Sequence, residues 1–541
     1  MNKQTPARND PCDCGSGKKY KKCCLNRSKP ASDKAGNLSL AIKTAHQFMV
    51  SQNPVSAEKE FNAALKVDKN SIEALIGLGQ CLCLQWRNTE GIQFLLQAGA
   101  NLINHAKKTR DVRQLLDLAY LLNNLQEPKK ALPFIDVALR LVPEFPRAHH
   151  TKALVLQRID SDSAYNSAKK AVQLAPDQSN AIILLAELES KQGDVRSAKQ
   201  RLQKLIAHNS SVDLSRANRV LETVLDKLGE YDQAFSCFIQ AGKLSQQREA
   251  QQIDKNAVEL DLDQSTKIFD KIYLQNCVNK VSDNLPSPVF LLGFYRSGTT
   301  LMEQILGAHP DIITSDEAYI IPSVAREITK FSSTQGSIQE KIKSLSSDQI
   351  LHLRQFYWQT AEQMVGQKLS GKVFIDKTTM NTLNLGLINT IFPNATVLFA
   401  LRDPRDVCLS CFMQSFGLSP LTVNFLAWQE TTRFYALTMN YWLSVRNHLT
   451  MSWMELKYEE ILNNLESQFS PVFKKLELKW SPDCEKFYMH AKTKSVKTPS
   501  FDQVTQPIYH SSIQRWRNYE RHFIEVTDNL DFFVQHLGYE K

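Results

Sequence analysis

The sequence predicts a multidomain chain in which an all-α region is followed by an α/β domain with a parallel sheet. Two observations predict this combination. Between about residues 38 and 245, apolar residues recur at helical spacing and short polar turns interrupt them. From residue 287 onward, short β-rich runs alternate with helical segments, which is typical of parallel strands joined by crossover helices. A chain of 541 residues is also too long for one typical core, so two to four domains are expected.

The first segment, residues 1–28, concentrates positive charge and cysteine. Residues 1–30 hold eight Lys or Arg and two Asp, a net charge of +6 out of +9 for the whole chain. The four cysteines in this segment follow the pattern C-x-C-x8-C-C: Cys12, Cys14, Cys23 and Cys24. Four thiolates so close together suit a tetrahedral zinc ion, which would supply the folding energy that so short a peptide lacks. Two disulfides in a basic tail are the alternative.

This cysteine-rich segment resembles the SEC-C motif, known from the tail of the bacterial preprotein translocase motor. The resemblance implies a docking role, with zinc held by the four cysteines. The lysines around them suit an acidic partner. Because the other 511 residues carry only +3, the charge pattern does not predict a specific nucleic-acid surface. A linker, Arg27 to Asn37, is expected to follow.

The helical region, residues 38–245, contains a repeat. Small residues follow polar turns at intervals of 34, 40, 33, 34 and 36 residues: Ala57, Gly91, Ala131, Ala164, Ala198 and Ala234. This period resembles that of tetratricopeptide repeats, which are helix–turn–helix units of about 34 residues. The resemblance implies a solenoid whose groove binds a peptide or protein. A helical bundle without repeats is the alternative.

Composition places the chain among ordinary globular proteins, with 43% hydrophobic and 22% charged residues. It has no apolar run of about 18 residues, so no membrane span is predicted. The N-terminus has no apolar signal region, and a cytoplasmic location is expected by default.

A connecting segment, residues 246–286, leads to the predicted α/β domain, residues 287–541. Four strands are expected in this domain: Val289–Leu292, Val373–Ile375, Ala395–Leu401 and Trp453–Lys457. Ligands of parallel sheets bind beyond the carboxyl ends of the strands. The residues just after the four strands are therefore candidates for a binding site.

The loop after the first predicted strand has the glycine spacing of a phosphate-binding loop, Gly293-x4-Gly298. Such a loop presents backbone N–H groups and a helix N-terminus to an anion. Nucleotide hydrolases continue with a lysine that reaches the β- and γ-phosphates, but this chain has Thr299 there. A cation lies inside the loop instead, at Arg296. The loop is therefore expected to bind a nucleotide with a short phosphate arm, which argues against an ATP or GTP hydrolase or a phosphotransferase.

Two motifs in this domain carry a family resemblance. Phe294–Met302, followed by Ala308–Asp311 and Ser315–Glu317, is similar to the opening of tyrosylprotein sulfotransferases. Leu401–Ser410 resembles the 3′-phosphate-binding segment of sulfotransferases in general. The resemblance covers about residues 286–541. It implies a P-loop-like sulfotransferase domain that uses 3′-phosphoadenylyl sulfate as its sulfuryl donor.

The resemblance also assigns roles to residues of this chain. The loop Arg296, Ser297, Gly298, Thr299 and Thr300 would bind the 5′-phosphosulfate. Arg402 and Ser410 would bind the 3′-phosphate, and Tyr458 would contact the donor. Lys377 would stabilise charge on the leaving group, and Ser500 would lie at the sulfate. The segment after it, with Arg515, would close over the nucleotide.

The resemblance implies Glu317 as the general base that takes the proton of the acceptor hydroxyl. Glu317 lies 21 residues after Arg296, the spacing seen in the family. An ordinary acid at a helix N-terminus is the other interpretation of Glu317, and Asp316 is its weaker rival as base. Two family arginines are replaced here, by Tyr319 and by Gln414; the first change puts recognition of acidic peptides in doubt.

The sequence thus predicts a sulfotransferase with an acceptor hydroxyl, a protein tyrosine being one candidate. A scaffold that binds the nucleotide without turnover is the second hypothesis. The sequence does not name the acceptor, the ligand of the repeats, the partner of the cysteine segment or the oligomeric state.

Overall fold

The structure is a computed structural model. It describes residues 9–12, 16–22, 31–51, 53–85, 87–157, 159–208, 213–248, 250–251, 253–331, 336–493, 504–508 and 510–540. By its internal contacts the chain divides into two compact units, Met1–Leu188 and Glu189–Lys541.

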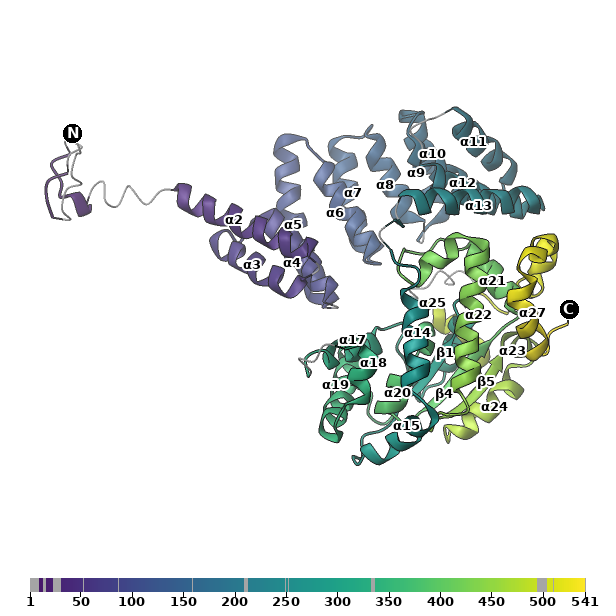
Figure 1. Cartoon of the computed structure of the whole chain (residues 1–541). Coiled ribbons are helices and arrows are strands. Elements are labelled where there is room, and N and C mark those ends of the chain that lie inside the picture. Colours follow the sequence, from purple (N-terminus) through teal and green to yellow (C-terminus); the bar gives the residue numbers. More distant parts are fainter. Residues whose placement is uncertain are drawn as a thin grey trace. The chain divides into compact units, whose positions relative to one another are not determined.

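The first unit is a succession of helices that pack against their neighbours in sequence (Figure 1). Its helices are α2 (Ala31–Val50), α3 (Pro54–Val67), α4 (Ile72–Leu84), α5 (Asn88–Thr109), α6 (Arg113–Asn124), α7 (Pro128–Leu141), α8 (Pro146–Leu156), α9 (Ser161–Leu174) and the start of α10 (Ser179–Lys191). The expected helical repeat is confirmed. Proline in the first turn starts α3, α7 and α8, and side-chain caps start others, such as that of Asp160 before α9.

The small residues of the repeat lie where helices approach one another. Ala57, Ala131 and Ala164 are fully buried. A Cβ at Gly91 would lie 2.6 Å from the carbonyl oxygen of Gly79, so the crossing of α4 and α5 requires glycine there. The 40-residue interval that follows Gly91 reflects the length of α5, which has 22 residues.

The second unit contains the last repeat helices, α11 (Val195–His208), α12 (Leu214–Lys227) and α13 (Tyr231–Arg248). The connecting elements α14 (Ala257–Ile268), α15 (Lys271–Asn276) and η2 (Cys277–Lys280) follow. A five-stranded parallel sheet comes next, formed by β1 (Val289–Gly293), β2 (Ile312–Thr314), β3 (Val373–Asp376), β4 (Thr396–Leu401) and β5 (Ser452–Lys457). The order is β2-β3-β1-β4-β5. The parallel sheet is confirmed, and β2 is an addition, because three residues are too few to give a strand pattern in the sequence.

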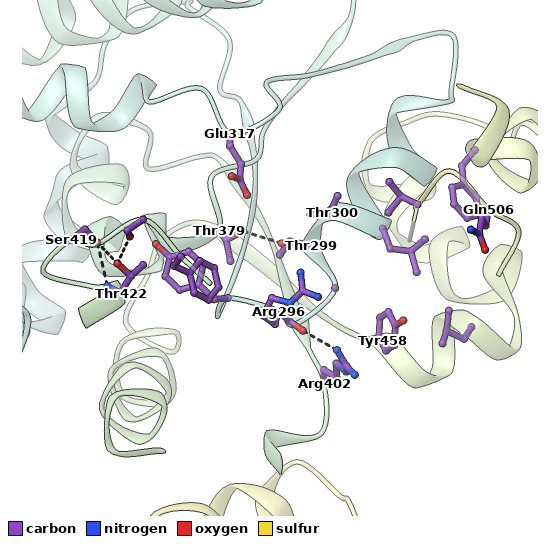
Figure 2. Close-up of a pocket in the computed structure, with 18 of the residues that line it drawn as sticks. Arg296, Thr299, Thr300, Glu317, Thr379, Arg402, Ser419, Thr422, Tyr458 and Gln506 are labelled. Carbon is purple, nitrogen blue, oxygen red and sulfur yellow. Dashed lines mark hydrogen bonds between the residues drawn. The ribbon is translucent and has the colours of Figure 1, made fainter. Parts of the chain in front are cut away.

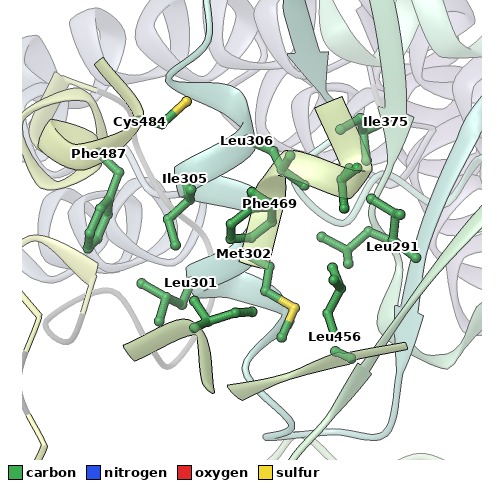
Figure 3. Close-up of a cluster of buried hydrophobic side chains, with 14 of the residues drawn as sticks. Leu291, Leu301, Met302, Ile305, Leu306, Ile375, Leu456, Phe469, Cys484 and Phe487 are labelled. Carbon is green, nitrogen blue, oxygen red and sulfur yellow. The ribbon is translucent and has the colours of Figure 1, made fainter. Parts of the chain in front are cut away.

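Helices cover both faces of the sheet. On one face, α16 (Thr299–Gly307), α23 (Tyr458–Asn463), α24 (Leu465–Lys475) and α25 (Phe487–Thr493) bury an apolar cluster against the strands (Figure 3). On the other face, rings from α19 (Ser347–Val365) and α22 (Trp428–Val445) pack on the strands: Tyr357 meets Phe290, and Trp442 stacks on Phe399 at 3.9 Å. Burial on both faces explains why the strands are continuous apolar runs.

The remaining elements lie around this layered core. They are α17 (Ile320–Ile328), α18 (Ile338–Lys343), η3 (Thr379–Asn384), α20 (Leu385–Ile391), α21 (Pro404–Met413), η4 (Thr422–Leu426), η5 (Pro482–Lys486), η6 (Arg515–Val526) and α27 (Thr527–His536).

The last repeat helix packs directly on the α/β part of the second unit. On α13, the ring of Phe235 stacks on His522 at 3.9 Å and meets Trp428 edge-on. A Cβ at Gly242 would lie 2.0 Å from the carbonyl oxygen of Leu426, so α13 touches η4 through backbone. Helices that the repeat pattern assigns to the array are therefore part of the core of this unit. The boundaries 1–28, 38–245, 246–286 and 287–541 stay predictions from the sequence.

None of the described helices is long and apolar enough to cross a membrane.

Candidate functional site

The loop between β1 and α16 has the backbone conformation that the glycine spacing predicts. Gly298 has a φ of 99°, and a Cβ there would lie 2.5 Å from the ring of Tyr458. Arg296 is also left-handed, with a φ of 64°. The first N–H groups of an α-helix have no partner within the helix, so the start of α16 at Thr299 is suited to an anion.

The two arginines predicted to bind anions lie together. Arg296 Nε donates to Ser410 Oγ at 2.9 Å, and Arg402 Nη1 donates to the carbonyl oxygen of Arg296 at 3.1 Å. The Arg402 guanidinium also lies 4.9 Å from the ring centre of Tyr458. Arg402 Nε and Ser297 Oγ are buried and find no hydrogen-bond partner among the described residues. Buried polar groups normally have partners, so an unpartnered nitrogen on Arg402, which lines the cavity described next, is consistent with a ligand there.

A cavity of about 480 Å³ opens in front of the loop (Figure 2). Seven of the predicted site residues line it: Arg296, Gly298, Thr299, Thr300, Glu317, Arg402 and Tyr458. Thr379, which the sequence did not single out, bonds Thr299 Oγ1 at 2.9 Å and lines the same cavity. In Figure 2, Glu317 and Arg402 lie on opposite sides of Arg296. The carboxylate and the two cations thus face one space.

The other predicted residues lie outside the lining. Ser297, Lys377 and Ser410 stand behind it and contact the loop or residues that line the cavity. Arg515 forms an ion pair with Asp226 of α12, with 2.7 Å between Nη2 and Oδ2, and does not line the cavity. Ser500 is not among the described residues.

Behind the cavity, Lys377 forms a buried ion-pair cluster. Its Nζ lies 2.9 Å from Glu317 Oε1 and 3.1 Å from Glu303 Oε2. Lys377 and Glu303 are fully buried, whereas the Glu317 side chain is 38% exposed. Burial alone would lower the pKa of Lys377, but the charges of Glu303 and Glu317 outweigh it and the pKa is raised. The pKa of Glu303 is raised by its burial, against the opposing effect of Lys377.

The backbone at Asp316 and Glu317 is held in a strained conformation. Their φ angles are 47° and 59°, in the left-handed region. Asp316 N donates to Glu303 Oε1 at 2.9 Å, and Glu317 N donates to the carbonyl oxygen of Lys377 at 3.0 Å. These two bonds fix the turn that presents Glu317 to the cavity. Glu303 was missed by the sequence analysis, although an acid within the apolar run of α16 is its signal.

Asp376, next to Lys377, is a second buried carboxylate. It accepts a hydrogen bond from the Tyr357 hydroxyl at 2.9 Å, and burial raises its pKa to about 7. Burial therefore favours the neutral form of this carboxyl group near the site.

A strap of residues 510–519 closes one side of the two-arginine site. Arg402 Nη2 donates to the carbonyl oxygen of Ser512 at 2.6 Å, and the Tyr458 hydroxyl lies 2.9 Å from Ser512 Oγ. The Asp406 carboxylate accepts from the backbone N–H groups of Gln514 and Trp516 at 2.8 and 2.9 Å. The strap is therefore held by the segments after β4 and β5, which also contain residues of the predicted anion site.

Of the four predicted zinc ligands, Cys12 is among the described residues, and the other three lie outside them. Cys12 is buried, and its backbone N–H donates to the carbonyl oxygen of Lys18 at 2.9 Å. Within the described part of the chain, no group of three or more His, Cys, Asp or Glu is placed to hold a metal ion.

Comparison with known proteins identifies two regions of the chain. Residues 288–482 match the sulfotransferase family, and residues 8–26 match the SEC-C motif. The resemblance of the α/β region to sulfotransferases is confirmed. The first match covers both strand-end motifs of this sulfotransferase region, the loop at Arg296 and the segment at Arg402.

Individual relatives are distant. An uncharacterized protein of Aquifex aeolicus is 26% identical over 421 residues, which are 75% of this chain and 53% of that protein. Human protein-tyrosine sulfotransferase 1 is 28% identical over 141 residues, 25% of this chain and 36% of that protein. The chain thus spans about half, or less, of the length of these curated relatives. A tetratricopeptide repeat protein from Parabacteroides merdae is similar in structure, with 18% identity, a TM-score of 0.30, and coverage of 39% of this chain and 86% of that one.

Removing the buried ammonium should destabilise the second unit. We expect Lys377→Met to lower the free energy of unfolding by about 3–5 kcal/mol, because Glu303 would remain buried without its partner. The double variant Glu303→Gln/Lys377→Met should recover much of this loss, since Gln keeps an oxygen for Asp316 N. Denaturant unfolding followed by tryptophan fluorescence measures both changes.

The matched control is Lys343→Met, an exposed lysine in α18 of the same unit. Equal instability of the single and double variants would mean that the cluster does not act as a paired unit.

Proposed function

We propose that the sulfotransferase region transfers a sulfuryl group from 3′-phosphoadenylyl sulfate to an acceptor hydroxyl, a protein tyrosine being one candidate. The observation that carries this proposal is the single cavity lined by Arg296, Arg402 and Glu317. The donor bears a 5′-phosphosulfate and a 3′-phosphate, so it needs two anion sites and no triphosphate cradle. Arg296, within the phosphate-binding loop, and Arg402, just after β4, offer one cation for each anionic end.

Each anionic end of the donor has matching groups. The start of α16, with Thr299 and Thr300, suits the 5′-phosphosulfate, because the donor's negative charge would face unpaired N–H groups and hydroxyls. Arg402, with its unpartnered Nε, suits the 3′-phosphate. Ser410 holds the Arg296 side chain between these two places.

In the transfer step, Glu317 acts as the general base on the acceptor hydroxyl. The acceptor oxygen forms a bond to sulfur while the bond from sulfur to the bridging phosphate oxygen breaks. The electron pair of the broken bond stays with 3′,5′-adenosine bisphosphate, and the acceptor proton passes to the Glu317 carboxylate. Lys377, whose Nζ lies 2.9 Å from Glu317 Oε1, holds the base in position from behind the cavity.

The other regions would select partners. We propose that the repeats bind a peptide or protein in their groove, by the concave geometry common to solenoids. The basic cysteine segment would dock on an acidic partner, and the whole protein would work in the cytoplasm.

Transfer itself is the first test. With sulfur-labelled donor and a panel of peptides, phenols and sugars, we expect label to reach at least one acceptor. Glu317→Gln should slow transfer on the order of 10²-fold or more, as for other general bases. Arg296→Ala should weaken both donor binding and transfer.

Two exposed side chains of the same unit provide controls, Glu466→Gln and Arg326→Ala. Donor binding without transfer to any acceptor would contradict the proposal and favour the nucleotide-binding scaffold.

The strap generates a second prediction. Asp226 Oδ2 pairs with Arg515 and Asp226 Oδ1 accepts from the Tyr519 hydroxyl at 2.5 Å, so a repeat helix anchors the strap that Arg402 touches. We expect Asp226→Asn to weaken binding of 3′,5′-adenosine bisphosphate about tenfold, which corresponds to about 1.4 kcal/mol. Calorimetric titration measures this affinity, and the exposed Asp483→Asn is the control. An unchanged affinity would show that the strap closes without its anchor.

We propose that Cys12, Cys14, Cys23 and Cys24 hold one structural zinc ion. Buried Cys12 and the short backbone pairing of Pro11 with Lys19 fit a compact turn at this position. Metal analysis of protein prepared without chelators should give about one zinc per chain, and Cys12→Ser/Cys14→Ser should lose it. Full metal content in the double variant would rule this ligand set out.

A further inference from the structure

A second cavity, of about 430 Å³, adjoins the first one. The two share Tyr295, Glu317, Tyr319 and Thr379 as lining residues. Glu317 therefore borders both spaces. A hydroxyl that enters the second cavity would reach the carboxylate from the side opposite the two arginines.

The two cavities differ in charge. The first contains the cations Arg296 and Arg402. In the second, no Lys, Arg or His is found among the described lining residues, and its two ionisable acids are Glu317 and Asp261. An anionic group would be repelled there, whereas a cation would be attracted.

Two polar side chains in the second cavity each have a hydrogen-bonding atom without a partner among the described residues. Asn381 is 1% exposed; its Oδ1 accepts from Asn384 at 3.3 Å, but its Nδ2 is buried and has no partner among the described residues. Asp261, on α14, accepts from Gln339 through Oδ1, which fixes its side chain, and no described residue donates to Oδ2. A buried donor and a fixed carboxylate indicate a ligand that offers an oxygen and a cationic group.

Apolar and aromatic side chains line much of the rest of the second cavity. Tyr295 and Tyr319 form the border with the donor cavity, and Leu383, Met380, Pro322 and Leu421 contribute apolar surface. Such walls suit an aromatic ring, whose faces pack on apolar groups while its hydroxyl remains free to react.

We propose that the second cavity is the acceptor site and that it takes an aromatic hydroxyl compound with a cationic group nearby, such as a tyrosine flanked by lysine. This rests on the sulfotransferase function proposed above. The ring lies between the tyrosines, its hydroxyl reaches Glu317, and Asp261 binds the cation. Asn381 Nδ2 donates to an oxygen of the acceptor, such as a peptide carbonyl.

The test compares acceptors that differ only in charge. Tyramine, 4-ethylphenol and 3-(4-hydroxyphenyl)propionate carry an ammonium, no charge and a carboxylate on similar phenols. Peptides with tyrosine between two lysines or between two glutamates form the second arm, which distinguishes a peptide from a small phenolic amine. With sulfur-labelled donor, we expect kcat/KM to be at least tenfold higher for the cationic member of one series than for its anionic member.

Substitutions at Asp261 test whether this residue selects the charge of the acceptor. Asp261→Asn keeps an oxygen for Gln339 and should bring the ratio of cationic to anionic kcat/KM close to one, while Asp261→Lys should invert it. Asp263→Asn, an exposed aspartate on the same helix, should leave the ratio unchanged. Asn381→Ala should raise KM more than it lowers kcat.

The outcomes separate this inference from the function on which it rests. Transfer that favours the carboxylate or glutamate acceptors, or a ratio that Asp261→Asn does not change, would overturn the acceptor class and leave the sulfotransferase function standing. Binding of 3′,5′-adenosine bisphosphate without transfer to any of the five acceptors would overturn the acceptor class, and failure with the sugars of the wider panel as well would overturn the sulfotransferase function. Binding of tyramine to the bisphosphate complex, measured by calorimetry, provides a readout that does not depend on turnover.

Discussion

The buried ammonium of Lys377 is the interaction on which the site depends. It joins Glu303, from the helix that begins at the phosphate-binding loop, to Glu317, from the turn after β2, and it follows directly on β3. Three segments that are distant in sequence are thereby held together. A charge cluster in this position is costly to desolvate, so it persists only because each charge has a partner. Its benefit is geometric, since the strained turn at Glu317 is held in place by the same groups.

Much of this site could be predicted from local sequence. Gly293 and Gly298 indicated the loop because backbone conformation and close packing require glycine there, and the strands were apolar runs that ended in charged residues. The contributions of Thr379 and Asp226 could not be predicted, because each acts through a contact made only in the folded chain. Glu303 had a signal, an acid within an apolar helix, but that signal does not tell which residue it pairs with. Asp226 and Arg515 are 289 residues apart in sequence. No local pattern reports a pair so distant, and Arg515 by itself suggested a nucleotide contact.

The two adjoining cavities carry side chains of opposite charge, and the Glu317 carboxylate lies at the border between them. Arg296 and Arg402 lie on the side of the loop, and Asp261 lies on the side of α14. Because Glu317 borders both spaces, its charge contributes to both fields. The replacement of a family arginine by Tyr319 belongs to this pattern, since Tyr319 lies in the shared wall and brings no positive charge to it. The two cavities therefore differ in the sign of the ligand charge that they favour.

The packing of α13 has a consequence for how this protein can change during evolution. Phe235 lies against Trp428 and Phe412, side chains that are themselves almost wholly buried. A gene fusion that replaced the repeats up to the start of the sheet would expose this aromatic surface to water and remove the partner of Arg515. We therefore expect an exchange of α13 to require compensating changes in the aromatic side chains of the α/β region.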